Sequence, residues 1–579
     1  MKLTRILAAL GVLTVVLLLL FAGFAQWWQE KEPSPFMVAA ANPYATEAGA
    51  EILRQGGSAV DAAIAVQAVL SLVEPESSGL AGGAFMLHFD KGEDRLDAYD
   101  GRETAPKGAT PALFLDGNGE PLPFLDAMIS GRSVGTPGVV KMLWLAHSEH
   151  GKLEWAKLFQ PAIKLAEEGF QVAPKLAQAI ARDPVLMQMP VAQDYFYRKD
   201  DKDGGARVPY GEGETLTNPA YAATLKLIAE KGWQGFYEGP VAEEIVTAVQ
   251  NAPARPGTLT LDDLAGYEAK KREPLCAPYR AYRVCSMPPP TSGGLTALQI
   301  LGILENYDLR GMEPMTLTSV HFIAEAEKLA YADRDKYIGD PDFVEVPVEA
   351  MLDKDYLKSR ADQIDASLSM GKAKAGRLKD ERAFNWGLNQ PVDRPSTSHF
   401  SIVDSDGNVV SMTTSVEGPF GAHLMAGGMI LNNQLTDFSF SPEEDGRPVA
   451  NAVAAGKRPR SSMTPVIVFD EDGAFRAVIG SPGGSRIIGY VTQTLIALID
   501  WDMSMKEAIA LPRFLDRNGA LEIEAGTDLE ALAPQLGQLG HKVEIRPQMS
   551  GLHGILVTQH GLEGAADPRR DGTVISEQP

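Results

Sequence analysis

The chain has 579 residues, of which 45% are hydrophobic and 22% are charged, and its formal net charge is −23. This length allows a large core and permits several domains. The acidic balance argues against nucleic acid and anionic membrane as ligands of the main body, because both carry negative charge. The sequence shows no internal repeat and no low-complexity tract.

The N-terminus begins with a segment that can enter a membrane. Lys2 and Arg5 precede an uncharged, leucine-rich run over residues 6–25. About 20 apolar residues can cross a bilayer, whereas a signal-peptide core has roughly 7–15. Gly23–Ala25 offers a small-x-small cleavage site, so an uncleaved anchor and a cleaved signal peptide both stay open, with length favouring the anchor. Either predicts export of the body to the periplasmic or extracellular face, because the basic flank stays cytoplasmic.

A strand over Arg95–Tyr99 is predicted to end just before Arg102, which lies in Asp100–Pro106. This arginine follows a strand end, where a side chain can project into a site. Further glycine-rich, proline-rich or charged segments follow one another along the chain in this order: Gly56–Ala63, Ser78–Phe85, Met287–Gly294, Ala330–Arg334, Gly339–Pro341 and Asp437–Phe438.

The only two cysteines, Cys276 and Cys285, flank a hairpin pattern centred on Arg280 and Ala281. Counting outward from a two-residue turn places them directly opposite each other. Cross-strand neighbours can form a disulfide, and an exported domain meets an oxidising compartment. A disulfide and two semi-buried free thiols both remain open.

The most informative segment is Pro395–Ser401, in which Thr397 opens a strand pattern. The pattern turns at Asp406-Gly407 and returns through Ser411 and Met412. With a two-residue hairpin turn, which Asp-Gly favours, Ser415 is predicted to lie opposite Ser398, and residues 415–417 to surround Thr397. A threonine that cleavage makes N-terminal is a good nucleophile, because its own α-amine, with a pKa near ~8, serves as general base.

A second glycine turn lies downstream of this hairpin. Val466–Phe469 and Phe475–Gly480 read as strands, and Gly483-Gly484 leads into an apolar helix over Ile487–Ile499. Paired glycines allow backbone N–H groups to approach a ligand closely, and a helix N-terminus favours negative charge. This turn therefore predicts an oxyanion hole.

Together, these segments resemble the γ-glutamyltranspeptidase (glutathione hydrolase) family of N-terminal-nucleophile hydrolases over nearly the whole chain after the first 35 or so residues. The resemblance implies an α+β fold, a four-layer αββα sandwich with two mostly antiparallel sheets. Hairpins such as Phe400–Met412 and Val466–Gly480 agree with it. It also implies three parts: residues 1–35 as anchor or signal peptide, 36–396 as large subunit, and 397–579 as small subunit. The two subunits of one precursor would form a heterodimer.

The resemblance assigns a role to each candidate residue. Thr397 would attack the carbonyl of Ser396 during maturation and the γ-glutamyl amide during turnover, with Ser415 hydrogen-bonded to it. The remaining roles are substrate α-carboxylate binding by Arg102, Ser461 and Ser462, α-ammonium binding by Gln434, Asp437 and Glu417, and oxyanion stabilisation by Gly483 and Gly484. The implied substrates are glutathione and its conjugates, with water, an amino acid or a peptide as acceptor.

Two departures from the family pattern concern the substrate. Glu417 replaces a common asparagine, which adds a second carboxylate beside Asp437. The segment Ser439–Gly456 is shorter than the covering loop of many relatives and contains no tyrosine, which predicts a more open pocket. A cephalosporin (glutaryl) acylase-like amidase of the same fold is therefore the alternative. A membrane-anchored binding protein that never matures is a third hypothesis.

No metal ion or cofactor is expected. The nine histidines are scattered, and the pair His147 and His150 reads as one face of a surface helix. His399, two residues after the nucleophile, is interpreted as structural because the α-amine makes a second base unnecessary. No glycine pair is followed by the Gly-Lys-Ser/Thr of a phosphate loop.

Overall fold

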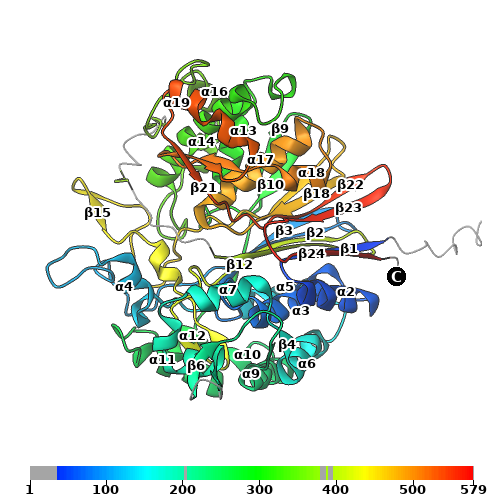
Figure 1. Cartoon of the computed structure of the whole chain (residues 1–579), viewed down its shortest axis with the longest axis vertical. Coiled ribbons are helices and arrows are strands. Elements are labelled where there is room, and N and C mark those ends of the chain that lie inside the picture. Colours follow the sequence, from blue (N-terminus) through cyan, green and yellow to red (C-terminus); the bar gives the residue numbers. More distant parts are fainter. Residues whose placement is uncertain (1–34, 201–204, 379–385, 389–395, 578–579) are drawn as a thin grey trace, which may run out of the picture.

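The computed structural model describes residues 35–200, 205–378, 386–388 and 396–577. Two large sheets lie at the centre and helices cover their outer faces (Figure 1). Every strand pair within these two sheets is antiparallel. The predicted four-layer αββα arrangement is confirmed.

The first sheet has seven strands. Their order is β24 (Thr573–Glu577), β1 (Phe36–Ala40), β11 (Ser398–Val403), β12 (Val409–Ser415), β2 (Gly83–Asp90), β3 (Arg95–Gly101) and β8 (Lys270–Arg272). The second sheet has six strands, in the order β23 (Gly561–Ala566), β22 (His553–Thr558), β18 (Phe475–Gly480), β17 (Val466–Phe469), β10 (Tyr282–Ser286) and β9 (Leu275–Tyr279).

Both faces of the first sheet are apolar, because each packs against another layer. On β1, Phe36 and Val38 join the cluster under one helical layer, whereas Met37 and Ala39 join the cluster between the sheets. This alternation follows the period of two along a strand. Strands buried on both faces carry apolar runs instead of apolar–polar alternation.

The helical layer on the first sheet is built on α2 (Pro43–Arg54), α3 (Ala59–Val73) and α5 (Val139–His150). Every residue of α3 is buried, and Ser58 caps its N-terminus in a capping box with Asp61. The rest of this half contains α4 (Phe124–Met128), α6 (Gln160–Glu168), α7 (Pro174–Arg182), α8 (Pro190–Phe196), α9 (Pro219–Lys231), α10 (Gln234–Tyr237), α11 (Pro240–Gln250) and α12 (Leu261–Ala265).

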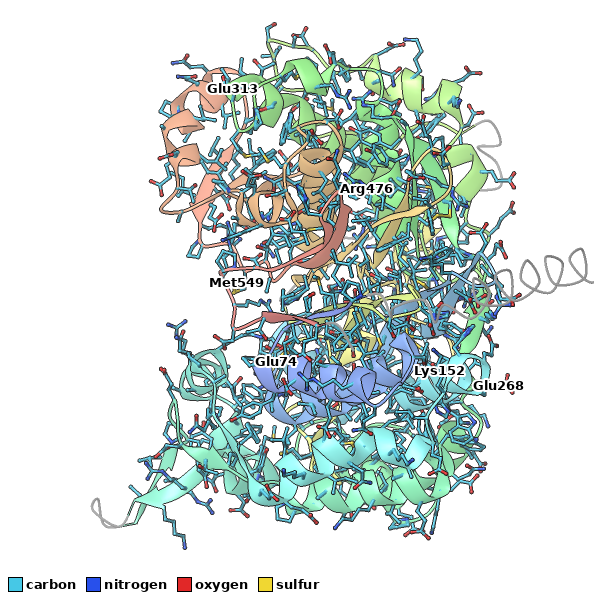
Figure 2. The ribbon with its side chains drawn as sticks, turned by 90° about the vertical axis from the view of Figure 1, so that its right-hand side faces the viewer. Glu74, Lys152, Glu268, Glu313, Arg476 and Met549 are labelled. Atoms are coloured by element: carbon cyan, nitrogen blue, oxygen red, sulfur yellow. A yellow bond between two sulfur atoms is a disulfide. The ribbon has the colours of Figure 1, made fainter. Side chains whose placement is uncertain are left out.

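The layer on the second sheet is formed by α13 (Gly293–Leu304), α14 (Leu317–Tyr337) and α17 (Ile487–Ile499). In Figure 2, Glu74, at the end of α3, and Arg476, on β18, mark the lower and upper halves. The remaining helices are α15 (Val348–Met351), α16 (Lys354–Ala361), α18 (Met505–Ala510) and α19 (Ala533–Gln538). A small sheet of β19 (Phe514–Asp516), β20 (Leu521–Glu524) and β21 (Val543–Arg546) contains a parallel pair.

Short strand pairs complete the fold. They are β4 (Phe170–Gln171) with β7 (Thr215–Leu216), β5 (Tyr197–Asp200) with β6 (Ala206–Pro209), β13 (Met425–Ala426) with β14 (Met429–Ile430), and β15 (Glu443–Glu444) with β16 (Arg447–Pro448).

The predicted hairpin around the cysteines is confirmed. Tyr279 pairs with Tyr282, which leaves a two-residue turn, and Cys276 lies directly opposite Cys285. The two cysteines form a disulfide, so the free-thiol alternative is wrong.

The hairpin after Thr397 forms, but its predicted register is wrong by one residue. Val403 pairs with Val409, so the turn has five residues instead of two. Asp404 causes the longer turn, because its side chain accepts hydrogen bonds from the N–H groups of Asp406 and Asn408. Ser398 therefore pairs with Thr414, and Ser415 lies opposite Thr397.

Both sheets contain strands from each side of the predicted cleavage point. In the first sheet, β11 lies between β1 and β12, and β12 pairs with β2. In the second, β10 pairs with β17. Cleavage before Thr397 would leave subunits joined by shared sheets, although the boundaries 36–396 and 397–579 stay predictions.

The predicted anchor or signal peptide, residues 1–35, lies almost wholly outside the described residues, and its apolar run over residues 6–25 does so entirely. Within the part of the chain that the structure describes, no helix is long and apolar enough to cross a bilayer.

Candidate active site

A polar pocket forms where Thr397 enters the first sheet, next to the N-terminus of α17. It gathers nearly all of the residues that the sequence proposes. The lining residues are Arg102, Ser396, Thr397, Ser415, Glu417, Gln434, Asp437, Ser461, Ser462, Met463, Gly484, Ser485 and Ile487. They come from segments more than 300 residues apart, which β3, β11 and β12 bring to the same end of the sheet.

Thr397 lies at the centre of this pocket and is buried. Its hydroxyl contacts the carbonyl oxygen of Ser396 and lies 3.2 Å from the Ser415 hydroxyl oxygen. The Ser415 oxygen also accepts a hydrogen bond from the Glu417 N–H at 2.9 Å. Arg570 donates to the Thr397 carbonyl at 3.2 Å. The intact chain therefore holds the hydroxyl beside the peptide bond that it is predicted to cleave.

Arg102 is fully buried and makes contacts that the sequence did not predict. It forms an ion pair with Asp437, and its other donors reach the carbonyls of Pro459 (3.0 Å) and Arg460 (3.2 Å). The side chain thus fixes the backbone that leads directly into Ser461. In this state Asp437 occupies part of the fork that a substrate carboxylate would use.

Hydrogen-bond acceptors gather on one side of the pocket. Gln434 donates to Asp437 at 2.8 Å, while its own Oε1 is buried without a hydrogen-bond partner among the described residues. The Glu417 carboxylate accepts from Asn433. Glu417 has φ +82°, a left-handed conformation in which asparagine is enriched among non-glycine residues. The arrangement of three acceptors suits a cation such as an ammonium group.

Two serine hydroxyls on another wall are placed to donate. The Ser461 oxygen accepts from the Met463 N–H at 3.1 Å, and the Ser462 oxygen accepts from Arg334 at 2.7 Å. A hydroxyl that accepts from a donor keeps its own hydrogen for another partner. Both serines can therefore donate to an anion in the pocket.

The glycine turn before α17 has the backbone that the sequence predicted. Gly483 and Gly484 have φ values of +137° and +61°, which glycine adopts without steric cost. Gly484 lines the pocket, whereas Gly483 does not. A Cβ on Gly483 would lie 2.8 Å from the Tyr490 ring, so this turn also requires glycine for packing.

A buried network behind Thr397 was not anticipated. Ser398 donates to Glu74 at 2.6 Å and accepts from Ser78 at 3.0 Å. Lys175 lies 3.3 Å from the Glu74 carboxylate and 3.0 Å from that of Glu76. Burial raises the pKa of Glu76. The network joins residues 74–78, Lys175 and Ser398, which are far apart in sequence, and only the glycine-rich segment Ser78–Phe85 hinted at it.

His399 lies outside the lining of the pocket. Its ring contacts Thr413 (2.9 Å) and Ser401 (3.2 Å), and burial holds its pKa well below the usual range. The interpretation of His147 and His150 as one surface face is wrong for His150. The side chain of His150 is only 5% exposed and packs on the His88 ring.

The segment Ser439–Gly456 contributes no residue to the pocket lining within the described chain. It forms the β15–β16 hairpin, and Phe440 stacks on Phe114 and Phe124. Asn451 fixes its return by donating to the Asp437 carbonyl at 2.7 Å. The more open pocket expected from the short segment stays a prediction.

Comparison with known proteins covers almost the whole chain. The family described as Gamma-glutamyltranspeptidase matches residues 45–576. The Glutathione hydrolase proenzyme of Escherichia coli is 40% identical over 92% of this chain and 90% of the relative. The Acylase ACY 1 proenzyme of Pseudomonas sp. (strain SE83) is 36% identical over 94% of this chain and 95% of the relative.

Solved structures give the same picture. A cephalosporin acylase from Bacillus halodurans has a TM-score of 0.80 at 29% identity, covering 94% of this chain and 96% of that chain. The Helicobacter pylori gamma-glutamyltranspeptidase has a TM-score of 0.52 at 35% identity, covering 56% of this chain and 90% of that chain. With the family match spanning most of the sequence, the chain belongs to the γ-glutamyltranspeptidase family and is an enzyme.

Proposed function

We propose that this enzyme is an exported, self-cleaving γ-glutamyl hydrolase and transferase that acts on glutathione and its conjugates. One observation carries the proposal. The pocket around Thr397 holds donors for a carboxylate on one wall and acceptors for an ammonium group on another. A γ-glutamyl group presents both charges on its α-carbon, which two methylene groups join to the carbonyl of the amide that is cleaved.

Maturation begins with the Thr397 hydroxyl, which contacts the Ser396 carbonyl in the intact chain. Its oxygen attacks the carbonyl carbon, the bond from that carbon to the Thr397 nitrogen breaks, and an ester forms. Water then hydrolyses the ester, which leaves a carboxylate on Ser396 and a free amine and hydroxyl on Thr397. The name proenzyme, carried by the relatives, supports this step.

Turnover uses the same hydroxyl, and the α-amine that maturation has freed serves as its base. The freed α-amine of Thr397 takes the hydroxyl proton while the oxygen attacks the γ-carbonyl of the substrate. Ser415, at 3.2 Å, orients the hydroxyl. The turn at Gly484 supplies backbone N–H groups to the oxyanion, and the leaving amine takes the proton. Water, an amino acid or a peptide then accepts the γ-glutamyl group from the Thr397 ester.

Binding of the γ-glutamyl group would replace the ion pair between Arg102 and Asp437 with two ion pairs to the substrate. Arg102 and Asp437 pair with each other in the free site. A γ-glutamyl group inserted between them would place its carboxylate on Arg102 and its ammonium on Asp437. The Ser462 hydroxyl would add one further bond to the carboxylate, and the Gln434 oxygen, which has no partner among the described residues, would add one to the ammonium group.

A second candidate is an amidase for cephalosporin-type or glutaryl amides, because acylases appear among both the relatives and the structural neighbours. A glutaryl chain carries the carboxylate but lacks the ammonium. It would separate Asp437 from Arg102 without supplying a new cation, which would leave the half-buried Asp437 carboxylate without its charged partner. The γ-glutamyl function is therefore ranked first.

Denaturing electrophoresis with N-terminal sequencing tests maturation, and matched amides test the substrate. We expect a small subunit that begins at Thr397, and faster turnover of γ-glutamyl-p-nitroanilide than of glutaryl-p-nitroanilide. Faster turnover of the glutaryl amide would establish the acylase alternative. A single uncleaved chain without activity would instead support the inactive binding protein.

A further inference from the structure

Two histidines and an aspartate from three elements meet on the helical side of the β2–β3 hairpin. His88 lies on β2, Asp97 on β3, and His150 at the end of α5. One ligand atom from each lies within 4.8 Å of the other two. The cluster shares no residue with the candidate active site, since none of the three lines that pocket.

The spacing within this cluster fits a metal ion. The Nε2 of His150 lies 3.2 Å from Asp97 Oδ2, and one ligand nitrogen of His88 lies within 4.8 Å of a ligand atom of each of the other two residues. Ligands bound to zinc at about 2.0–2.2 Å with tetrahedral geometry are separated by about 3.3–3.5 Å. Two imidazole nitrogens and one carboxylate oxygen are a ligand set typical of zinc and its neighbours in the transition series.

His88 gives independent support for a ligand. It is 1% exposed, and its Nδ1 is buried without a hydrogen-bond partner among the described residues. Buried polar atoms in native proteins are nearly always satisfied, and an exception calls for a ligand, water or ion. A metal ion bound at this nitrogen would provide the missing partner.

The surrounding charges favour a cation. Asp90 and Glu149 approach His150 at 3.9 Å and 3.6 Å, while Arg95 and Lys271 each lie 3.0 Å from Asp97. Three carboxylates therefore face two basic side chains. The Tyr99 hydroxyl donates to Glu149 at 2.7 Å, and its oxygen lies 2.8 Å from the Nε2 of His150, a contact that a metal bound to this nitrogen would replace.

A second histidine cluster differs from this one in the hydrogen bonding of its ring nitrogens. His321 and His541 hydrogen-bond each other at 2.7 Å, and their other nitrogens contact the Asp365 carbonyl (2.7 Å) and Lys328 (3.3 Å). All four ring nitrogens are engaged within the protein. This cluster is a satisfied hydrogen-bond chain, and among the described residues it has no counterpart of the unpartnered Nδ1 of His88.

We propose that His88, Asp97 and His150 bind one divalent transition-metal ion of the zinc class, with water completing the coordination. The ion joins the end of α5 to the β2–β3 hairpin. Its role is structural, because β3 ends at Gly101, directly before Arg102, and the cluster holds the other half of that strand. The proposal does not depend on which amide the enzyme cleaves.

The test uses the untagged full chain after dialysis against a chelator. Calorimetric titration with zinc chloride is expected to show one site per chain, and cobalt chloride to give visible d–d absorption. H88Q and H150Q are expected to weaken zinc binding by more than about 100-fold. The matched control is H147Q, one turn earlier on α5, whose ring contacts the Leu153 carbonyl at 2.9 Å and which should bind zinc normally.

K271Q provides an independent measurement if the histidine variants fail to fold. Lys271 competes with the metal for Asp97, so its removal is expected to tighten zinc binding by about tenfold. The proposal is overturned if the wild type does not bind zinc at micromolar concentrations, if H88Q and H150Q bind as the wild type does, or if K271Q leaves the affinity unchanged.

Discussion

The hydroxyl oxygens of Thr397 and Ser415 lie 3.2 Å apart because the five-residue turn after Val403 brings these two residues opposite each other. A two-residue turn would have placed Ser415 opposite Ser398. Since side chains alternate between sheet faces, a slip of one residue would also turn Ser415 to the other face. The side chain of Asp404, which fixes the turn, thus determines which hydroxyl lies beside that of Thr397.

Replacement of Ser415 with alanine should slow both maturation and turnover by about 2–10-fold, the loss expected for a neutral hydrogen bond. S415T should retain activity because it keeps the hydroxyl. Subunit formation is followed on denaturing gels, and kcat is measured with γ-glutamyl-p-nitroanilide. The matched control is T414V, since the Thr414 hydroxyl has no hydrogen-bond partner among the described residues. Equal rates for S415A and the wild type would rule out this role.

Replacement of Arg102 with alanine should raise KM for γ-glutamyl amides by about 10–150-fold, because a hydrogen bond to a charged group is worth about 1.5–3 kcal/mol. Arg102 also holds the carbonyls of Pro459 and Arg460, so R102A perturbs the serine wall as well. R102K keeps the charge but loses the planar fork, and should give an intermediate KM. A folded R102A enzyme with unchanged KM would show that the carboxylate is read elsewhere.

The disulfide between Cys276 and Cys285 closes a short loop, with a sequence separation of 9. Loop-closure entropy for such a loop is about 2–3 kcal/mol, so reduction should lower the thermal unfolding midpoint. The double variant C276S/C285S should unfold at the reduced protein's temperature and should not respond to reductant. Identical midpoints for the oxidised, reduced and double-variant proteins would contradict a stabilising role.

Glu103 should make stability depend on pH. Burial raises the pKa of its carboxyl group from 4.5 to about 8, and both oxygens lack a hydrogen-bond partner in the described chain. At pH values below the pKa of Glu103 in the unfolded chain, its carboxyl group is protonated in both the folded and the unfolded state. As pH rises toward 8, only the unfolded state ionises, so the contribution of Glu103 to stability is lost.

The variant E103Q cannot ionise and should gain stability relative to the wild type as pH increases. The expected gain is a few kcal/mol between about pH 5 and about pH 8, measured as a widening difference in thermal midpoint. The exposed residue Glu93 supplies the control E93Q, which should show no such trend. A constant difference between E103Q and the wild type at both pH values would refute the protonated state of Glu103.

Much of the fold could be predicted because local patterns and the family resemblance agreed. The helix Ile487–Ile499 and the cysteine hairpin occur with the predicted bounds and register. The turn after Val403 was missed, because Asp-Gly gave a strong local signal and the competing acceptor, Asp404, lies two residues earlier. A side chain that bonds its own backbone can override a turn preference.

The contacts that support the candidate site could not be predicted from the sequence. Most of the predicted residues do line one pocket, but the pairing of Arg102 with Asp437 joins positions 335 residues apart. The cluster of His88, Asp97 and His150 depends in the same way on the packing of α5 against β2 and β3. A sequence motif identifies candidate residues within one segment. Contacts between distant segments depend on how the layers of the fold pack together.

Glu417 offers the sharpest test of substrate identity. Its carboxylate lies in the pocket with that of Asp437, and its φ of +82° suits asparagine better than glutamate. E417N should therefore fold at least as stably as the wild type and retain glutathione turnover within about tenfold, because the amide oxygen still accepts a hydrogen bond. E417Q, which also removes the charge but not the backbone strain, is the matched control.

The same variant should change selectivity. Removal of one carboxylate weakens the attraction for the substrate ammonium, so the preference for γ-glutamyl over glutaryl amides should fall by about tenfold in E417N and E417Q alike. The ratio of kcat/KM values for the two p-nitroanilides measures this preference. If both variants keep the wild-type ratio, Glu417 does not face the ammonium, and recognition of that group would have to come from Asp437 and Gln434 alone.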